Sequence, residues 1–382
     1  MSKWSKAWVG IACATSLIFG AANAAPPSPL TDDTVLLRVP KRTQPRSVDA
    51  AKAPDLESAI KSAQQWIDTA RRDHDPRSYG YAQQALAPWW TQTEPPLAML
   101  RLRATILQVD HHFELAYSDL KKIIALAPQD AQAQLDAATL LTTSARYREA
   151  RIHCAALAKL SRGLIPVMCQ AQIDGVEGDV EGALIRINTA LRTDSNAPAT
   201  IRAWATTLAA ELYERAANNE EAQRAFATAI ALNPQDMYTR IAFADFLLSK
   251  QESTRVFALF EGAASALPDA ALLRLAIAAK RSGRADAEAL RSQLQARLQA
   301  GAQRGDTAHA REAALFALHV EGNSTRAAEL ALSNWKSQKE PTDALLLLQA
   351  GRTAKNGAAL QAANEWLAAT RFQHPSLTQK TY

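Results

Sequence analysis

Proline residues recur in this 382-residue chain at a spacing that constrains its fold more than any other feature. Pro234 and Pro268 are 34 residues apart, as are Pro341 and Pro375, and Pro128 lies four units of 35 residues before Pro268. Proline ends a helix because it has no backbone N–H to donate and its ring clashes with the preceding turn. A regular period of this length therefore predicts a series of similar helical units.

Within one period, small and large apolar residues occupy fixed positions. In the unit from Ala203 to Pro234, alanine stands at the two positions where paired helices would cross, Ala210 and Ala222. Small side chains there let the helices approach closely, while larger residues fill the grooves between a helix and its neighbours. The next unit keeps the same offsets with Ala244, Leu247, Phe260, Ala263 and Pro268.

This pattern resembles the tetratricopeptide repeat (TPR), a helix–turn–helix unit of about 34 residues. The resemblance covers most of the chain from Leu56 to Phe372 and is strongest in the middle. It implies an all-α fold, a right-handed α-solenoid over residues 55–373, followed by a C-terminal tail of residues 374–382. The low glycine content, 14 residues in 382, agrees with a helical chain and disfavours glycine-rich nucleotide folds.

The first 24 residues have the pattern of a secretory signal peptide. Lys3 and Lys6 precede an uncharged apolar stretch over residues 7–22, and Ala22-Asn23-Ala24 fits the small-x-small cleavage rule. The stretch is shorter than the roughly 20 residues that a membrane-spanning helix needs, which disfavours an uncleaved anchor. We therefore expect a periplasmic protein with no stable membrane span after cleavage. Residues 25–54, rich in proline and polar residues, are predicted to form a linker or disordered arm.

Two cysteines remain after removal of the signal peptide, because Cys13 leaves with it. In an oxidising compartment, Cys154 and Cys169 are a disulfide candidate. Cys154 falls on the second helix of one unit and Cys169 on the first helix of the next, and these elements pack together in a TPR array. The alternative is a pair of buried thiols that act as small apolar side chains.

Motifs that carry chemistry are absent from this sequence: it has no GxGxxG, GxxxxGK[ST], GxSxG or HExxH. His111, His112 and Glu114 crowd a turn, but no second cluster supplies the ligands that would close a metal site. The 43 basic and 38 acidic residues are interspersed, without the basic, aromatic stripe of a nucleic-acid surface. We expect no catalytic residue, no cofactor, no metal, no nucleic-acid partner and no enzyme activity.

In a TPR array the first helix of each pair lines the concave surface, and spacings of three and four residues keep one helical face. These positions predict a polar groove with two aromatic residues and three carboxylates. The groove lacks the lysine and asparagine residues of the carboxylate-clamp subclass, so a basic or neutral extended segment fits it better. Alternatively, this face is only solvated, or the arm with Lys41, Arg42 and Arg46 covers it. The predicted partner-binding residues are Gln132, Thr139, Gln172, Trp204, Thr207, Glu211, Glu214, Tyr238 and Asp245.

These features favour a non-catalytic interaction scaffold of the bacterial cell envelope, which binds a peptide or protein on the concave face of a TPR array. The alternative is an envelope maturation or assembly factor with a thiol- or metal-dependent activity. A free thiol of low pKa in a pocket of cysteine and histidine would favour the alternative. A polar groove with aromatic residues favours the scaffold.

Overall fold

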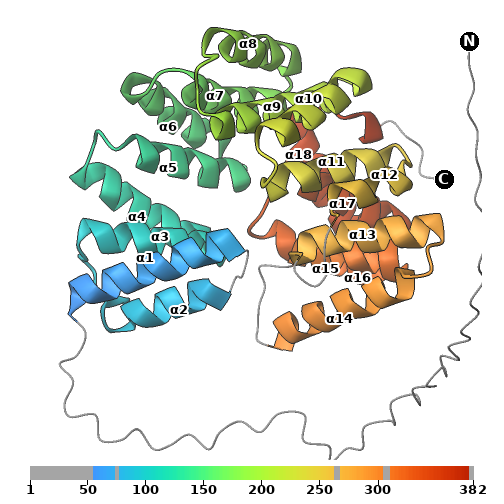
Figure 1. The fold of residues 1–382 in the computed structure, drawn as a ribbon, viewed down its shortest axis with the longest axis horizontal. Coiled ribbons are helices and arrows are strands. Elements are labelled where there is room, and N and C mark those ends of the chain that lie inside the picture. The colour runs from blue at the N-terminus through green and yellow to red at the C-terminus, as the bar shows by residue number, and fades with distance from the viewer. Residues whose placement is uncertain (1–54, 74–76, 262–266, 304–309, 378–382) are drawn as a thin grey trace, which may run out of the picture. The chain divides into compact units, whose positions relative to one another are not determined.

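The computed structural model describes residues 55–73, 77–261, 267–303 and 310–377, all within one compact unit of residues 54–382. Within these ranges the chain is helical and contains no β-strand (Figure 1). The predicted all-α solenoid is therefore confirmed for this part of the chain. The predicted signal peptide (1–24), the predicted arm (25–54) and residues 378–382 lie outside the described residues.

Successive helices pack as antiparallel pairs, and each pair packs on the next (Figure 1). The first half contains α1 (Leu56–Asp73), α2 (Arg77–Leu86), α3 (Leu97–Val109), α4 (Phe113–Leu126), α5 (Ala131–Thr143), α6 (Tyr147–Leu160), α7 (Leu164–Val176), α8 (Val180–Thr193) and α9 (Ala199–Arg215). The second half contains α10 (Asn219–Leu232), α11 (Met237–Ser249), α12 (Ser253–Leu259), α13 (Asp269–Ser282), α14 (Ala287–Gln303), α15 (Ala310–Phe316), α16 (Ser324–Trp335), α17 (Pro341–Ala354) and α18 (Gly357–Thr370). Shorter elements are the 3₁₀ turns Ala87–Trp89 and Pro375–Leu377 and the π turn Ala317–Glu321.

The residues that define the repeat pattern lie in the core between paired helices. Ala210 of α9 and Ala222 of α10 are fully buried, so the two helices approach closely at this point. Phe226 is buried beside them and stacks on Phe243 of α11, with ring centroids 5.2 Å apart. Each pair thus buries a face against the next, as a repeat without a core of its own requires.

Aspartates that follow the turn prolines begin the next helices. The side chain of Asp130 accepts a hydrogen bond from the backbone N–H of Ala133, and that of Asp236 accepts one from Tyr238. These N-caps satisfy backbone donors that have no partner within the helix. Asp269 differs, because it is the first residue of α13 and Pro268 holds the cap position.

The last helices of the solenoid return to its first half. The backbone N–H of Lys339 donates to the carbonyl of Thr143, 2.8 Å away. The indole N–H of Trp366 in α18 donates to the hydroxyl of Tyr147 at the start of α6, 3.2 Å away. Trp366 and Phe372 are buried in the same apolar cluster as Tyr147. Because a solenoid unit ordinarily contacts only its neighbours, this contact between residues 219 positions apart closes the array on itself.

Cys154 of α6 and Cys169 of α7 form a disulfide, with sulfur atoms 1.97 Å apart. Their Cα atoms are 5.6 Å apart, inside the range of about 4.4–6.8 Å that a bridge needs. Both residues are buried, at 2% and 8% exposure. The bridge joins the second helix of one pair to the first helix of the next, so it fixes the packing between two repeats.

We expect the double substitution Cys154→Ala/Cys169→Ala to lower the free energy of unfolding by about 3 kcal/mol, because a bridge across 15 residues restricts the unfolded chain by this order. Urea denaturation against the oxidised wild type measures the loss. Wild type denatured in the presence of a reductant is the control, and it should match the variant. Equal transition midpoints for the variant and the oxidised wild type would contradict a bridge in the native protein.

Gly178, in the turn between α7 and α8, lies against Arg371, the residue that follows α18. Its φ is +93°, and a Cβ added there would lie 3.0 Å from the carbonyl oxygen of Arg371. Gly283 also has a positive φ, +63°, but a Cβ there meets nothing within 4 Å. We expect Gly178→Ala to lower the free energy of unfolding by about 1–2 kcal/mol more than Gly283→Ala, because only Gly178→Ala disturbs the closing contact. Chemical denaturation of both variants measures this difference, and equal losses would contradict it.

Candidate binding surface on the inner helices

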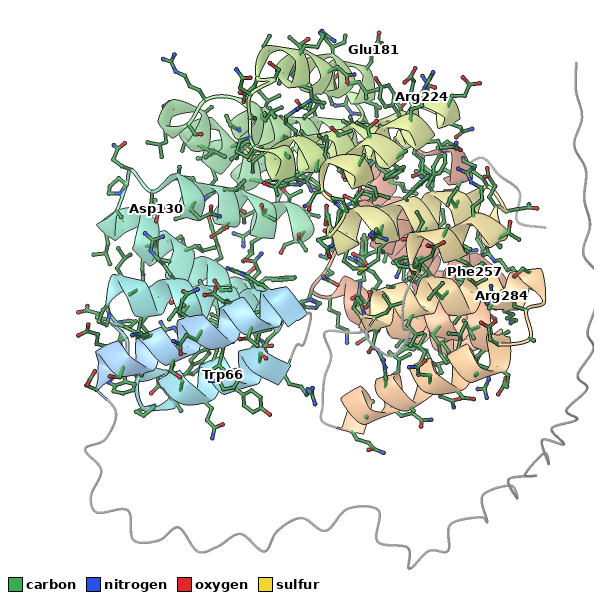
Figure 2. All side chains as sticks on the ribbon, in the orientation of Figure 1. Trp66, Asp130, Glu181, Arg224, Phe257 and Arg284 are labelled. Atoms are coloured by element: carbon green, nitrogen blue, oxygen red, sulfur yellow. A yellow bond between two sulfur atoms is a disulfide. The ribbon has the colours of Figure 1, made fainter. Side chains whose placement is uncertain are left out.

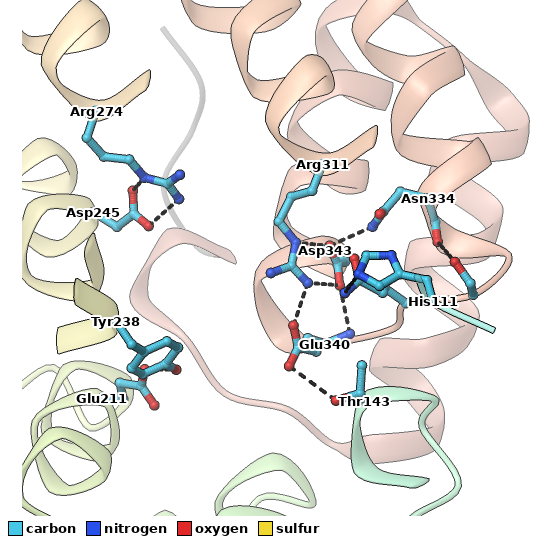
Figure 3. A network of polar contacts seen from close by, with 12 residues as sticks. His111, Thr143, Glu211, Tyr238, Asp245, Arg274, Arg311, Asn334, Glu340 and Asp343 are labelled. Atoms are coloured by element: carbon cyan, nitrogen blue, oxygen red, sulfur yellow. Dashed lines mark hydrogen bonds and ion pairs between the residues drawn. The ribbon is translucent and has the colours of Figure 1, made fainter. Parts of the chain in front are cut away.

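The candidate site lies where α9, α11 and α13 face α15 and the start of α17 (Figure 3). In Figure 3, Tyr238, Asp245 and Arg274 form one wall of the site, and Arg311, Glu340 and Asp343 form the other. We call this region the inner surface. It is defined by Glu211, Glu214, Tyr238, Asp245, Arg274, Arg311 and Glu340.

Tyr238, near the start of α11, presents its ring on the inner surface. Its hydroxyl donates a hydrogen bond of 2.6 Å to Oε1 of Glu211 on α9 (Figure 3). The bond fixes the orientation of the ring, yet 59% of Tyr238 stays exposed. An exposed ring held in one orientation offers contact area to a partner at little loss of conformational entropy.

Asp245 of α11 is paired within the chain. Arg274 of α13 donates from Nε and Nη2 to the two carboxylate oxygens, at 2.8 and 2.7 Å. The side chain of Arg274 is 7% exposed, whereas that of Asp245 is 43% exposed. A partner can therefore reach Asp245, but it adds to an existing ion pair.

The facing wall is held by Arg311 of α15. Its guanidinium donates to both carboxylate oxygens of Asp343, at 2.6 and 2.7 Å, and also to Glu340. Asn334 donates a further bond of 2.7 Å to Asp343, which is only 2% exposed and therefore needs these partners. Glu340 accepts from the hydroxyl of Thr143 at 3.5 Å, which connects this wall to the closing contact.

The carboxylates of the inner surface are hard to ionise. Burial raises the pKa of Glu214 from 4.5 to about 7; Lys250 opposes this shift, while the carboxylates of Glu211 and Asp245 add to it. Burial also raises the pKa of Glu211. The carboxylate of Glu211 raises the pKa of the Tyr238 hydroxyl that donates to it. Carboxylates that raise the pKa of neighbouring groups favour a cationic group among them.

The structure brings together part of the predicted groove. Glu211 and Tyr238 are bonded, and Glu214 and Asp245 lie on the same two helices as this pair. Trp204, also on α9, is 38% exposed. Gln132 and Thr139 on α5 and Gln172 on α7 lie on other helices, and none of them belongs to the inner surface. Gln132 donates to Asp136, four residues later in the same helix.

The predicted groove position of Thr207 is wrong. Thr207 is 1% exposed, and its hydroxyl shares a hydrogen bond of 2.6 Å with that of Thr239. This bond lies in the contact between α9 and α11. Helical offsets describe the face of a single helix, but they do not say how far the next helix covers that face.

Arg274, Arg311 and Glu340 were not predicted from the sequence. The repeat pattern is weak in their part of the chain, and their roles depend on long-range ion pairs. One local signal was available: Glu340 precedes Pro341 and has Asp343 three residues later, a pattern typical of a helix start. The structure shows a capping box there, in which Glu340 and Asp343 satisfy each other's backbone N–H groups.

The described ranges hold no group of three or more His, Cys, Asp and Glu residues placed to bind a metal ion. His111, one of the residues considered for such a site, lies 3.4 Å from the side-chain nitrogen of Gln338. In these same ranges, no helix has the length and the apolar character to cross a membrane.

The helix pairs resemble tetratricopeptide units in their spacing and in the small residues at their crossings. No protein-family model matches the chain, and no curated protein matches it. One similar solved structure is a tetratricopeptide repeat protein from Parabacteroides merdae, with 14% identity over 71% of this chain and 98% of that chain, and a TM-score of 0.37. A Rap protein complexed with competence and sporulation factor has 12% identity over 82% of this chain and 97% of that chain, with a TM-score of 0.48.

The human IFIT1 dimer with m7Gppp-AAAA has 12% identity over 82% of this chain and 71% of that chain, with a TM-score of 0.42. At TM-scores this low, none of these likenesses supports a conclusion about function. The assignment of the fold rests on the helices of this chain.

The raised pKa of Glu214 predicts a pH dependence of stability. Above its ordinary pKa of 4.5 the unfolded chain loses the proton while the folded chain keeps it, so stability falls as pH rises toward 7. We expect Glu214→Gln to remove this loss, so that the variant gains about 2–3 kcal/mol over wild type between acidic and weakly basic pH. Urea denaturation of both proteins across this range measures the gain. If the difference in unfolding free energy between Glu214→Gln and wild type does not change with pH, the raised pKa of Glu214 is contradicted.

Proposed function

We propose that the chain is a non-catalytic interaction scaffold of the bacterial cell envelope, which binds a basic or neutral extended segment of a partner protein on the inner surface. The observation that carries the proposal is Tyr238, an exposed ring anchored by Glu211 among carboxylates. The envelope location is inferred from the sequence of residues 1–24, which has the pattern of a signal peptide.

The chemistry of the inner surface fits a lysine or arginine side chain. Such a side chain can lie over the ring of Tyr238 as a cation–π contact while it donates hydrogen bonds to Glu211. Asp245 adds an accessible carboxylate on α11, whereas Glu211 lies on α9. Trp204, two turns earlier on α9, extends the apolar contact along that helix. An extended segment offers these groups alternate side chains without a fold of its own.

The alternative, a maturation factor with a thiol- or metal-dependent activity, has less support. The sulfur atoms of Cys154 and Cys169 are joined to each other, and both residues lie in the core. A redox-active cysteine needs access to its substrate and a microenvironment that stabilises the thiolate. The condition of access is not met at this bridge, because both cysteines are buried.

We expect a fluorescein-labelled, lysine-rich peptide to bind the purified chain more tightly than a glutamate-rich peptide of the same length. Trp204→Ala and Glu211→Gln should each weaken the lysine-rich complex by about 1–3 kcal/mol, as central interface contacts do. Glu211→Gln removes the charge but keeps an acceptor for the hydroxyl of Tyr238. Fluorescence anisotropy measures the dissociation constants.

Ile185→Ala on α8 is the matched control, because Ile185 is 60% exposed and lies outside the inner surface. The affinity of Ile185→Ala for the lysine-rich peptide should equal that of wild type. Circular dichroism should show the same helix content in every variant. Unchanged affinity in the double variant Trp204→Ala/Glu211→Gln would place the binding site elsewhere. Equal affinity for both peptides would contradict the preference for positive charge.

A further inference from the structure

The segment that follows α18 lies against the C-terminal end of α9. Phe372 is 6% exposed, and its ring centroid lies 5.3 Å from that of Trp366. The guanidinium of Arg215, the last residue of α9, lies over the same ring at 5.4 Å. The carbonyl oxygen of Arg371 would lie only 3.0 Å from a Cβ on Gly178, so the two backbones approach closely here. The segment is thus held by an aromatic anchor, a cation and a close backbone approach.

His374 extends this contact to the inner surface. Its Nε2 lies 3.8 Å from Oε1 of Glu214, and its ring stacks on Phe372 at 6.1 Å. Its Nδ1 is 2.7 Å from the hydroxyl of Ser376, in the 3₁₀ turn Pro375–Leu377. The side chain of Glu214 is consequently only 16% exposed. One of the carboxylates predicted to bind a partner is therefore covered by the chain itself.

We infer that residues 373–377 act as an internal ligand of the inner surface, which a partner segment must displace from Glu214, while Phe372 stays in the core as the anchor of the segment. This inference rests on the proposed function, because it concerns the same surface. It adds that the surface is partly occupied in the free protein, and that the occupant shows which chemistry this end of the surface accepts. That chemistry is a nitrogen base beside Glu214.

The contacts of this segment leave charged groups of the inner surface without suitable partners. A ligand that supplies those partners can therefore replace the segment. Burial, together with the charges of Arg215 and Lys250, lowers the pKa of His374 to about 4, so the imidazole is neutral near pH 7 and forms no ion pair with Glu214. In addition, Nη1 of Arg215 is buried without a hydrogen-bond acceptor among the described residues. A partner that carries a lysine would supply a permanent cation to Glu214. A backbone carbonyl of that partner would supply the acceptor that Arg215 lacks.

Hydrogen exchange of the full chain tests whether the segment is docked as described. In His374→Ala and in Phe372→Ala, we expect the amides of the α7–α8 turn and of the last turn of α9 to exchange about tenfold faster than in wild type. The amides of α3 and α4 serve as an internal reference and should not change. If Phe372→Ala does not fold, His374→Ala alone carries the test, because it keeps the buried anchor. Unchanged exchange at both sites in a folded variant would overturn the inference.

Binding of a labelled, lysine-rich peptide tests the competition. We expect its affinity for His374→Ala to be about tenfold higher than for wild type, because the segment no longer competes for Glu214. Gln373→Ala is the matched control, because Gln373 is exposed in the same segment. Faster exchange without a gain in affinity would overturn the competition. If the peptide binds none of the proteins, the proposed function fails, and the exchange result alone decides whether the segment is an internal ligand.

Discussion

The contact of Trp366 and Phe372 with the turn at Tyr147 is the interaction on which the inner surface depends. In a solenoid, the position of each unit is set only by its contacts with neighbouring units, so small differences in packing accumulate along the array. The closing contact removes this freedom, because it ties α18 directly to α6. Both rings are almost fully buried, and burial of a ring of this size contributes roughly 4–6 kcal/mol as an upper bound. Apolar burial therefore drives the closure, and the hydrogen bond between Trp366 and Tyr147 sets its register.

Ion pairs between the last helices fix the side of the inner surface that contains Arg311 and Glu340. Arg311 bonds Asp343 and Glu340, and Glu340 bonds Thr143 on the other side of the closing contact (Figure 3). A buried pair of this kind gives little net stability, because desolvation offsets much of the attraction. It penalises every arrangement that leaves Asp343 without its donors. The closing contact and these ion pairs thus favour the same arrangement of the last helices.

The sequence predicted what is local and periodic. The positions of the helix pairs and the small residues at their crossings follow from the 34-residue spacing, because a helical face is set by neighbours three and four residues away. The spacing also predicted that Glu211 and Tyr238 face the same surface, but the hydrogen bond between them is known only from the structure. The closing contact could not be predicted, since Tyr147 and Trp366 are 219 positions apart and no repeat position marks them. Thr207 was misplaced for a related reason, because its burial depends on how deeply α11 packs on α9. Side chains cover the whole array (Figure 2), and periodicity alone does not distinguish those that face a neighbouring pair from those that face solvent.

The inner surface is not arranged for maximal stability. Glu214 is buried with a raised pKa, and Arg215, the next residue along α9, has a buried nitrogen without an acceptor in the described part of the chain. Each group is unfavourable in the folded protein, and both would be better satisfied if they were bonded to each other or replaced by apolar residues. They lie side by side at the place where the chain's own last segment docks. Groups that oppose folding and share one surface fit the proposed binding site, because the free energy withheld from folding becomes available when a ligand supplies the missing partners.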